Sequence, residues 1–220
     1  MKLAVLLPIY NEERDLAACL DRVLASPIAG EVIAVDDHST DASPQILERC
    51  NDPRLKVIRH EQNRGKGSAI QTALVHVQGD FCIIQDADTE YDPADYARLV
   101  EPIEQGRAQI VYGARDLRSQ PLIGYLGNLF LTLVTNLLLG TRLTDMETCY
   151  KVVPTALMRE LHLCSLGFEI EPEITAKLAR RGAKIAQVPI SYAPRRDKKL
   201  HRFRDGFRSL WALIRFRFGS

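Results

Sequence analysis

The sequence predicts an α/β fold in which helices cover both faces of a mainly parallel central sheet. Short apolar runs alternate with longer amphipathic stretches through the first half of the chain, and this alternation is typical of repeated strand–helix–strand units. The 220 residues, of which 46% are hydrophobic and 26% charged, suit an ordinary globular protein with one full core. We therefore expect a single domain over residues 1–220.

The early elements follow from this alternation. Apolar runs predict strands at residues 3–7, 31–35, 55–59, 81–84 and 109–112. Amphipathic stretches predict helices at residues 13–25, 42–50, 66–78 and 93–105. In a parallel sheet, ligands bind at the carboxyl ends of the strands, so the residues after each apolar run are candidates for the site.

The second half of the chain is less regular. Residues 119–141 contain no charged side chain. Beyond them we expect helices at residues 154–163 and 172–181, a strand at residues 184–190, and a basic helix from about residue 203.

Five cysteines are scattered along the chain, and none lies in a close pair such as CxxC. This usage argues against a disulfide framework or a zinc site and favours a reducing compartment. The apolar start of the chain is followed at once by Asn11, Glu12 and Glu13, so it predicts a buried first strand rather than a signal peptide.

The turns after the first two strands carry polar residues. The first turn reads Pro8-Ile9-Tyr10-Asn11-Glu12, where a dinucleotide-binding fold would place GxGxxG. After the second strand, Asp37 is suited to accept a hydrogen bond from a base N–H. The alternative is that Asp36 and Ser39 cap the next helix. Gly65-Lys66-Gly67-Ser68 lacks the longer frame of a phosphate loop.

The turn after the fourth strand carries alternate carboxylates, Asp86, Asp88 and Glu90. Three carboxylates at this spacing are able to converge on one hard cation. Mg²⁺ and Mn²⁺ prefer a partial oxygen cage that water and substrate phosphates complete. The alternative is a solvated acidic turn before the helix start at Asp92-Pro93.

The motifs occur in a fixed order that resembles family 2 glycosyltransferases of the A-type fold. The order is Pro8-Ile9-Tyr10-Asn11-Glu12, Asp36-Asp37-His38-Ser39, Asn63-Arg64-Gly65-Lys66-Gly67 and Asp86-Ala87-Asp88. Gly113-Ala114-Arg115 and residues 143–151 and 188–192 are similar to the polyprenyl-phosphate sugar transferases, a group that includes dolichol-phosphate mannose synthases. The resemblance covers nearly the whole chain and implies a nucleotide-diphospho-sugar transferase fold.

The resemblance also implies roles for single residues. Residues expected to line the nucleoside pocket are Pro8, Tyr10, Glu12 and Asp37, with Lys66 near the base. Residues expected to bind the Mg²⁺ or Mn²⁺ that bridges the donor diphosphate are Asp86, Asp88 and Glu90, although many relatives have Gln at the last position. Residues expected to meet phosphate are Arg115 and Lys151, with Arg195 and Lys199 in a basic loop that closes over the diphosphate. The acceptor-phosphate contact is unassigned between Arg118 and Arg142.

The implied reaction is an inverting displacement at the anomeric carbon with release of a nucleoside diphosphate. A lipid phosphate acceptor is mostly ionised at neutral pH, since its second pKa is about 6, and needs no strong base. A sugar hydroxyl acceptor needs a positioned carboxylate, for which Asp145 or Glu147 is the candidate. The preferred alternative is that Asp145 orients Lys151 or Arg115. The candidate catalytic residues are Asp88, Arg115 and Asp145.

Two segments bear on membrane contact. Residues 121–140 are long enough to cross a bilayer, but a span would separate Arg115 from Lys151, so we expect an interfacial or core helix. Residues 195–220 form a basic amphipathic segment, with nine Lys or Arg against Asp197 and Asp205. This pattern predicts peripheral contact with an anionic membrane, and the alternative is a helix packed on the domain with a solvated basic face. No nucleic-acid-binding motif accompanies the charge.

Three functions follow from these patterns. The leading one is transfer of a sugar, mannose or glucose by resemblance, from a GDP- or UDP-sugar to a dolichyl or undecaprenyl phosphate at the cytoplasmic face of a membrane. The second is transfer to a saccharide hydroxyl of a cell-surface polysaccharide. The third is a non-catalytic nucleotide-sugar-binding protein, which is disfavoured because all the expected metal ligands are present.

Overall fold

A computed structural model describes residues 2–195 and 202–218 and contains one seven-stranded sheet. The strands are β1 (Leu3–Ile9), β2 (Ala29–Asp36), β3 (Leu55–Arg59), β4 (Phe81–Ile84), β5 (Ile110–Arg115), β6 (Lys151–Pro154) and β7 (Ile185–Ile190). The α-helices are α1 (Leu16–Ala25), α2 (Ser43–Arg49), α3 (Lys66–His76), α4 (Tyr96–Glu104), α5 (Leu122–Leu139), α6 (Thr155–Glu160), α7 (Ile170–Arg180) and α8 (Arg202–Phe218). Short 3₁₀ turns, η1 (Pro93–Asp95) and η2 (Leu117–Ser119), precede α4 and α5.

The sheet is mainly parallel, as the sequence predicts. Its strand order is β3-β2-β1-β4-β6-β5-β7. β6 pairs antiparallel with both β4 and β5, and every other pairing is parallel. The strand order reverses at β1, where β2 leads to one side and β4 to the other, and such a reversal leaves a crevice at the carboxyl ends of the strands.

β6 is the strand that the sequence pattern missed. It has four residues, begins with a lysine and ends with a proline. Such a segment shows neither an apolar run nor an alternation, so periodicity cannot reveal it. Its role is to join the two parallel groups of strands on either side of it.

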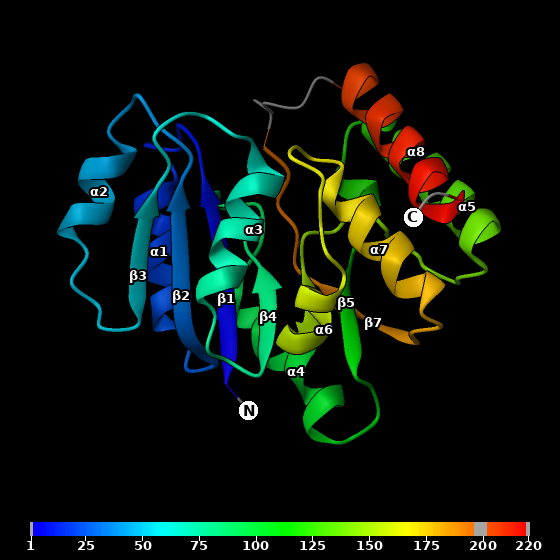
Figure 1. Ribbon diagram of the computed structural model, residues 1–220, viewed down its shortest axis with the longest axis horizontal. Helices are drawn as coiled ribbons and strands as arrows, with labels where there is room; N and C mark the ends of the chain where they lie inside the picture. The colour runs from blue at the N-terminus through cyan, green and yellow to red at the C-terminus, as the bar shows by residue number, and fades with distance from the viewer. Residues whose placement is uncertain (1, 196–201, 219–220) are drawn as a thin grey trace.

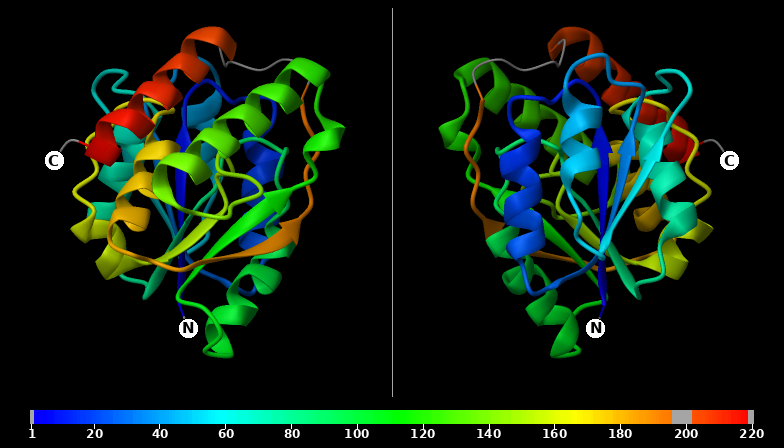
Figure 2. Two further views of the ribbon diagram at one scale, coloured as in Figure 1. Left: turned by 90° about the vertical axis from the view of Figure 1, so that its right-hand side faces the viewer. Right: turned by 90° about the vertical axis from the view of Figure 1, so that its left-hand side faces the viewer.

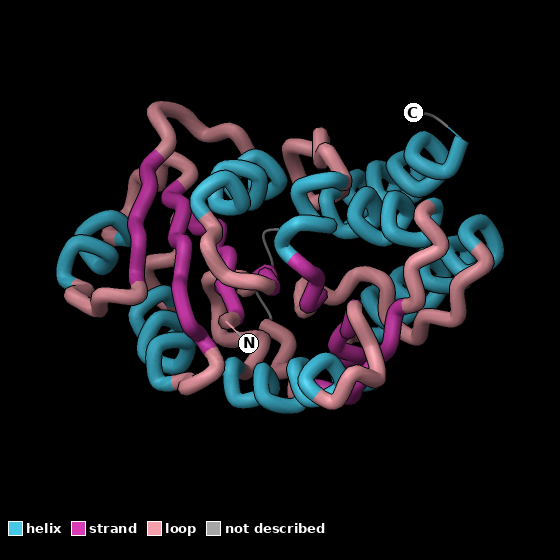
Figure 3. Tube along the Cα trace, turned by 60° about the horizontal axis from the view of Figure 1, so that its bottom comes forward, coloured by secondary structure: helices cyan, strands magenta, loops and turns pink. Residues whose placement is uncertain are grey.

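Helices cover both faces of the sheet. α3, α6 and α7 lie on one face, and α1 and α4 lie on the other (Figures 1 and 2). Figure 3 shows the helices on the outside of the strands. β1 and β2 are therefore buried on both sides, and their sequences are almost continuously apolar.

α5 departs from the expectation of a core helix, because most of its surface is exposed. Among the residues that the structure describes, it is the one helix long and apolar enough to cross a membrane, with a mean hydropathy of 1.7, and three of its 18 residues are buried. Its inward contacts come from Leu131, Thr132 and Thr135. The core interpretation is therefore wrong for α5, and the interfacial interpretation stays a prediction.

α8 packs against α7 and α5 (Figure 1). Its inner face buries Ala212, Leu213 and Phe216. Arg217 at its end donates a hydrogen bond to the Leu138 carbonyl of α5 over 2.8 Å. The helix thus docks on the domain and also keeps exposed side chains, which include Phe207 and Trp211.

Candidate active site

A cavity of about 800 Å³ lies at the carboxyl ends of β1, β2 and β4. The residues that line it are Pro8, Ile9, Tyr10, Asn11, Glu12, Asp37, Asn63, Gly65, Lys66, Ala69, Asp86, Ala87, Asp88, Glu90, Phe168 and Arg195. The structure thus brings nine of the residues singled out from the sequence to one place. They come from five segments far apart in the chain.

Asp37 shapes one wall of the cavity by holding a loop. Its Oδ1 accepts a hydrogen bond from the Arg64 backbone N–H at 2.8 Å, and its Oδ2 accepts one from Gly65 at 2.7 Å. The ring of His60 contacts Oδ1 at 2.6 Å. The carboxylate therefore fixes the backbone that leads into α3 by accepting its hydrogen bonds. The contact with a base that the resemblance implies for Asp37 stays a prediction.

The glycines of this loop are required by a second segment that crosses it. Gly65 has a φ of +91°, and a Cβ on Gly67 would lie 2.2 Å from the Ser165 carbonyl oxygen. The Gly67 N–H donates to the Leu166 carbonyl at 2.8 Å. Since only glycine allows this approach, the loop at residues 165–168 is held close enough to place Phe168 on the cavity wall.

Lys66, which is expected near the base, lines the cavity and reaches a carboxylate. Its Nζ lies 2.6 Å from Asp86 Oδ1 and 3.5 Å from Glu171 Oε1. Burial alone would lower the pKa of Lys66, but the charges of Asp86 and Glu171 raise it above its usual value. Lys66 is thus held as a cation that orients Asp86.

The three carboxylates expected to bind metal are not gathered around one point. Glu90 Oε2 accepts a hydrogen bond from the Tyr192 hydroxyl at 2.9 Å, and Glu90 Oε1 accepts one from the Arg195 backbone N–H at 2.7 Å. Among the side chains that the structure describes, at residues 2–195 and 206–218, no three of His, Cys, Asp or Glu are grouped to hold a metal ion. In this geometry Asp86 and Asp88 are the candidate ligands, and a direct metal contact by Glu90 stays a prediction.

That pair still suits a hard divalent cation. Mg²⁺ is usually held by one or two carboxylates together with substrate phosphates and water, rather than by a complete protein cage. The pKa of Asp88 is raised to about 7 by its burial and then by the negative charge of Asp86. Two carboxylates that repel one another in a cavity are stabilised by any cation that binds between them.

Arg195 closes the acidic end of the cavity. Its guanidinium contacts three carboxylates, Glu12 at 3.0 Å, Asp15 at 2.9 Å and Asp88 at 2.9 Å. Asp15 was not foreseen from the sequence, because it lies within the first turn before α1 and not at a strand end. Lys199, which the sequence assigns to the same basic loop, lies outside the described residues.

Arg115 and Asp145 lie beside the cavity and not on its wall. The Arg115 guanidinium donates two hydrogen bonds to Asp145, from Nε at 2.6 Å and from Nη2 at 2.8 Å, and the Arg115 backbone N–H donates a third at 3.2 Å. These hydrogen bonds agree with the preferred interpretation, in which Asp145 orients Arg115. The Arg115 guanidinium lies 5.0 Å from the centre of the Tyr192 ring, and Tyr192 in turn holds Glu90, so Arg115 is linked to the cavity through one side chain.

Lys151 does not reach the cavity, contrary to the phosphate contact expected for it. It is fully buried, pairs with Glu171 Oε2 at 2.5 Å, and donates to the Thr148 carbonyl. The reason is that Lys151 begins β6, and the start of that strand lies inside the sheet. Glu171 was missed from the sequence because the helix that carries it was expected to begin at residue 172.

Comparisons with known proteins give a consistent result. A sequence model described as glycosyl transferase family 2 matches residues 4–159. A low-salt glycan biosynthesis hexosyltransferase of Haloferax volcanii is 29% identical over 97% of this chain, which spans 52% of that relative's length. An undecaprenyl-phosphate mannosyltransferase of Micrococcus luteus is 26% identical, with 89% of this chain and 85% of the relative covered.

Solved structures agree on the fold. The glucosyl-3-phosphoglycerate synthase of Mycobacterium tuberculosis in complex with uridine diphosphate superimposes with a TM-score of 0.78 at 22% identity. The match covers all of this chain and 81% of the other. A structure of the same enzyme with Mn²⁺, uridine diphosphate and glucosyl-3-phosphoglycerate gives a TM-score of 0.76 at 21% identity, with 100% of this chain and 81% of the other covered.

Proposed function

The chain belongs to glycosyl transferase family 2, and we propose that it transfers a sugar from a nucleoside diphosphate donor to a polyprenyl phosphate at the cytoplasmic face of a membrane. Its fold is the A-type glycosyltransferase fold. The observation that carries the proposal is the single cavity that Pro8 and Tyr10 line together with the Asp86–Asp88 carboxylate pair. An aromatic, half-exposed wall and an acidic end are what a base and a metal-bound diphosphate require.

The donor is proposed to lie along the cavity, with its base toward Tyr10 and Asp37 and its diphosphate toward Asp88. The Tyr10 ring lines the cavity and is 42% exposed, so we expect a base to stack on it. Mannose or glucose from GDP or UDP is the expected donor. The solved protein of the same fold binds uridine diphosphate, so UDP is one of the two nucleotides to test.

Asp86 and Asp88 are proposed to hold Mg²⁺ or Mn²⁺. The bound cation would stabilise the negative charge that develops on the leaving diphosphate. The chain's own contribution is to fix these ligands, because Lys66 holds Asp86 and the Glu90 backbone N–H donates to Asp88 Oδ1 at 2.9 Å. Arg195 is proposed to exchange its carboxylate partners for donor phosphate oxygens when donor binds.

The chemical step is a displacement at the anomeric carbon. A bond forms from an acceptor phosphate oxygen to that carbon, and the bond from the carbon to the donor phosphate breaks. The electron pair leaves with the nucleoside diphosphate. Since the acceptor phosphate is already ionised near neutral pH, no residue has to remove a proton. The geometry of Asp145 agrees with this mechanism, because the Asp145 carboxylate is paired with the Arg115 guanidinium.

A polyprenyl phosphate acceptor is supported by two observations. One is the name of the Micrococcus luteus relative, an undecaprenyl-phosphate mannosyltransferase that this chain matches over most of both lengths. The other is the exposed apolar face of α5 next to α8, which suits a protein that works on a lipid at the surface of a bilayer.

Labelled GDP-mannose and UDP-glucose, incubated with the protein, Mn²⁺ and a membrane lipid extract, test the proposal. We expect label in a product that is soluble in organic solvent and labile to mild acid, as a sugar phosphodiester of a polyprenol is. Label found only in water-soluble saccharide would contradict the acceptor and support transfer to a sugar hydroxyl instead.

A further inference from the structure

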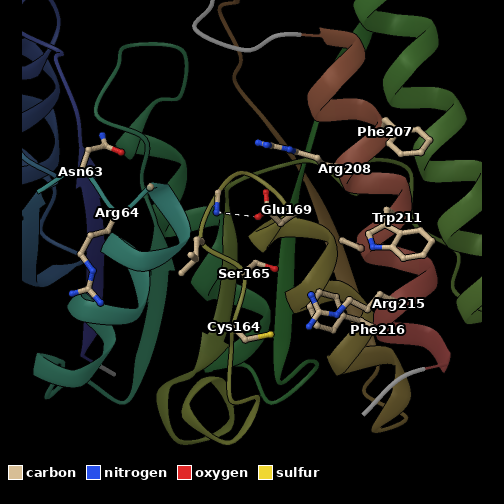
Figure 4. Close-up of a pocket in the computed structure, with 14 residues that line it drawn as sticks. Asn63, Arg64, Cys164, Ser165, Glu169, Phe207, Arg208, Trp211, Arg215 and Phe216 are labelled. Atoms are coloured by element: carbon tan, nitrogen blue, oxygen red, sulfur yellow. Dashed lines mark hydrogen bonds between the residues drawn. The ribbon is translucent and has the colours of Figure 1, made fainter.

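A second cavity, of about 680 Å³, lies outside the donor cavity on the side of α8. It is bounded by the loop at residues 63–65, the segment at residues 164–169 and one face of α8 (Figure 4). Asn63 and Gly65 line both cavities. None of the residues with a donor or metal role projects into this second space, so the proposed transfer reaction leaves it unexplained.

Three arginines surround this groove. Arg64 comes from the loop before α3, and Arg208 and Arg215 come from α8. All three are exposed, and none of them forms an ion pair with a side chain that the structure describes, at residues 2–195 and 206–218. Figure 4 shows Arg208 extended from α8 toward the loop that carries Asn63. Opposed to them on the groove wall is one carboxylate, Glu169, which accepts a hydrogen bond from the Gly167 N–H at 3.2 Å.

The rim of the groove is aromatic and continues into an apolar surface. Phe207 and Trp211 are 70% and 60% exposed, and both line the groove. Beyond α8 lies α5, whose outward residues are large and exposed: Leu122, Ile123, Leu126, Leu129, Phe130, Leu133 and Leu137. We call these seven residues the α5 apolar face. Basic residues beside an aromatic rim, with aliphatic side chains further out, reproduce the order of headgroup, interface and acyl chain in a bilayer.

We propose that this groove binds the phosphate headgroup of an anionic membrane phospholipid while the α5 apolar face contacts the acyl layer. The proposal rests on the membrane part of the proposed function and adds a defined lipid site to it. Guanidinium groups bind phosphate through paired N–H donors. Lipid bound in the groove would fix α8 against the loop before α3, and this loop also forms part of the donor cavity.

The shape of the surface favours a lipid over other anions. A nucleic acid requires a track of cations that follows a phosphate backbone, whereas these arginines surround one pocket and border exposed apolar side chains. A soluble phosphate compound would leave Phe207, Trp211 and the α5 apolar face in water. A lipid satisfies the cations and the apolar surface together.

Vesicle sedimentation tests the proposal, with vesicles of phosphatidylcholine alone or mixed with phosphatidylglycerol. We expect tighter binding to the mixed vesicles. Each of Arg208→Ala and Arg215→Ala should weaken that binding by about fivefold, the usual effect of one cation near an anionic surface. Arg107→Ala removes an exposed arginine that pairs with Glu101 at 3.6 Å, and this control should change binding by less than twofold.

Arg208→Lys separates a built site from diffuse attraction. The variant keeps the charge and loses the paired donors. A phosphate site therefore predicts weaker vesicle binding by the variant, and diffuse attraction predicts unchanged binding. Wild-type binding by Arg208→Lys, or equal losses for Arg107→Ala and Arg208→Ala, would overturn the proposal. So would equally tight binding of glycerol phosphate in solution, or binding that requires polyprenyl phosphate and ignores phosphatidylglycerol.

Nucleoside diphosphate binding with Mn²⁺ is measured on the same variants. Arg208 and Arg215 contribute nothing to the donor cavity, so this binding should match wild type. A wild-type protein that binds the nucleotide but does not distinguish the two kinds of vesicle would remove the lipid site and leave the transferase proposal standing. Intact lipid binding without any sugar transfer would do the reverse.

Discussion

Asp88 is held in an environment that opposes its charge. It lies just beyond the end of β4, is buried, and has a pKa raised to about 7 by that burial and then by Asp86. The counter-charge within the chain comes from Arg195, 2.9 Å away. A fold selected for stability alone would not keep two carboxylates so close, so this arrangement indicates a site kept for function.

Asp88→Asn should abolish sugar transfer without unfolding the protein. The amide keeps the shape of the side chain and loses the charge that binds the cation, so transfer should fall by ~100-fold or more. Because the site disfavours a charged Asp88, the thermal unfolding midpoint should not drop near pH 8. Radiolabel transfer and a thermal scan measure the two effects. Transfer at the wild-type rate would refute the metal assignment.

Glu147 predicts a pH dependence of stability. Burial, which outweighs the attraction of Lys151, raises its pKa to about 7 from the ordinary value of 4.5. Below the ordinary pKa, the folded and unfolded chains are both protonated. Between the two values the folded chain alone keeps the proton, so stability falls as pH rises toward about 7 and then levels off.

Glu147→Gln should remove this fall. Relative to wild type, the variant should gain stability as pH rises from about 5 to about 8, by roughly 1–3 kcal/mol. Chemical denaturation at several pH values measures the gain. Glu160→Gln, at an exposed position at the end of α6, should give a difference independent of pH. Parallel curves for Glu147→Gln and wild type would show that Glu147 does not titrate in this range.

At the residue scale, the sequence located side chains that follow strands and failed for those whose partners are distant. Asp37, Asp86 and Asp88 follow apolar runs, so their place at the sheet edge was predictable. The burial of Lys151 depends on Glu171, 20 residues further along the chain. No local pattern announces such a pair, because it exists only after α7 packs on the sheet.

At the scale of elements, the start of α3 and the segment at residues 165–168 behave as one unit. The two segments are about 100 residues apart in the chain, and the Leu166 carbonyl accepts hydrogen bonds from both Gly67 and Ser68. The sequence shows Gly65 and Gly67 as part of a motif. Their physical reason, the close approach of another backbone, emerges only from the three-dimensional packing.

Gly67→Ala should therefore destabilise the protein and weaken donor binding together. Its Cβ would meet the Ser165 backbone, so the segment that carries Phe168 must move, at a cost of about 1–3 kcal/mol. Gly127→Ala is the matched control, because no atom lies within 4 Å of its Cβ. A helical alanine there should stabilise the fold by about 0.5–1 kcal/mol. Denaturant unfolding and nucleotide titration give both readouts, and unchanged nucleotide binding by Gly67→Ala would separate the loop from the site.

α5 and α8 carry the prediction about membranes. Leu126→Glu on the α5 apolar face should weaken vesicle binding about tenfold or more, since it replaces an apolar side chain by a charge. Val75→Glu, at an exposed position on α3, controls for the added charge and should have a small effect. Point substitutions are preferable to removal of α8, because Leu213 belongs to the core. Equal effects of the two substitutions would exclude α5 from the membrane contact.

The whole molecule is two groups of parallel strands joined by one short antiparallel strand. The half built on β1 to β4 was predictable, because each strand is an apolar run between polar turns. The half that contains β5, β6 and β7 was predictable for β5 and β7 but not for β6. A four-residue strand is specified by its two neighbours, β4 and β5, and at least one long helix, α5, separates it from both in the chain.

Calorimetric titration of the purified protein with UDP and with GDP, in Mn²⁺ and again in EDTA, tests the central claim most directly. The account predicts that one nucleotide binds at one site per chain with Mn²⁺ present, and that chelation or Asp88→Asn removes the binding. Binding of neither nucleotide, or equal binding with and without Mn²⁺, would contradict the claim that this cavity holds a metal-bound nucleoside diphosphate.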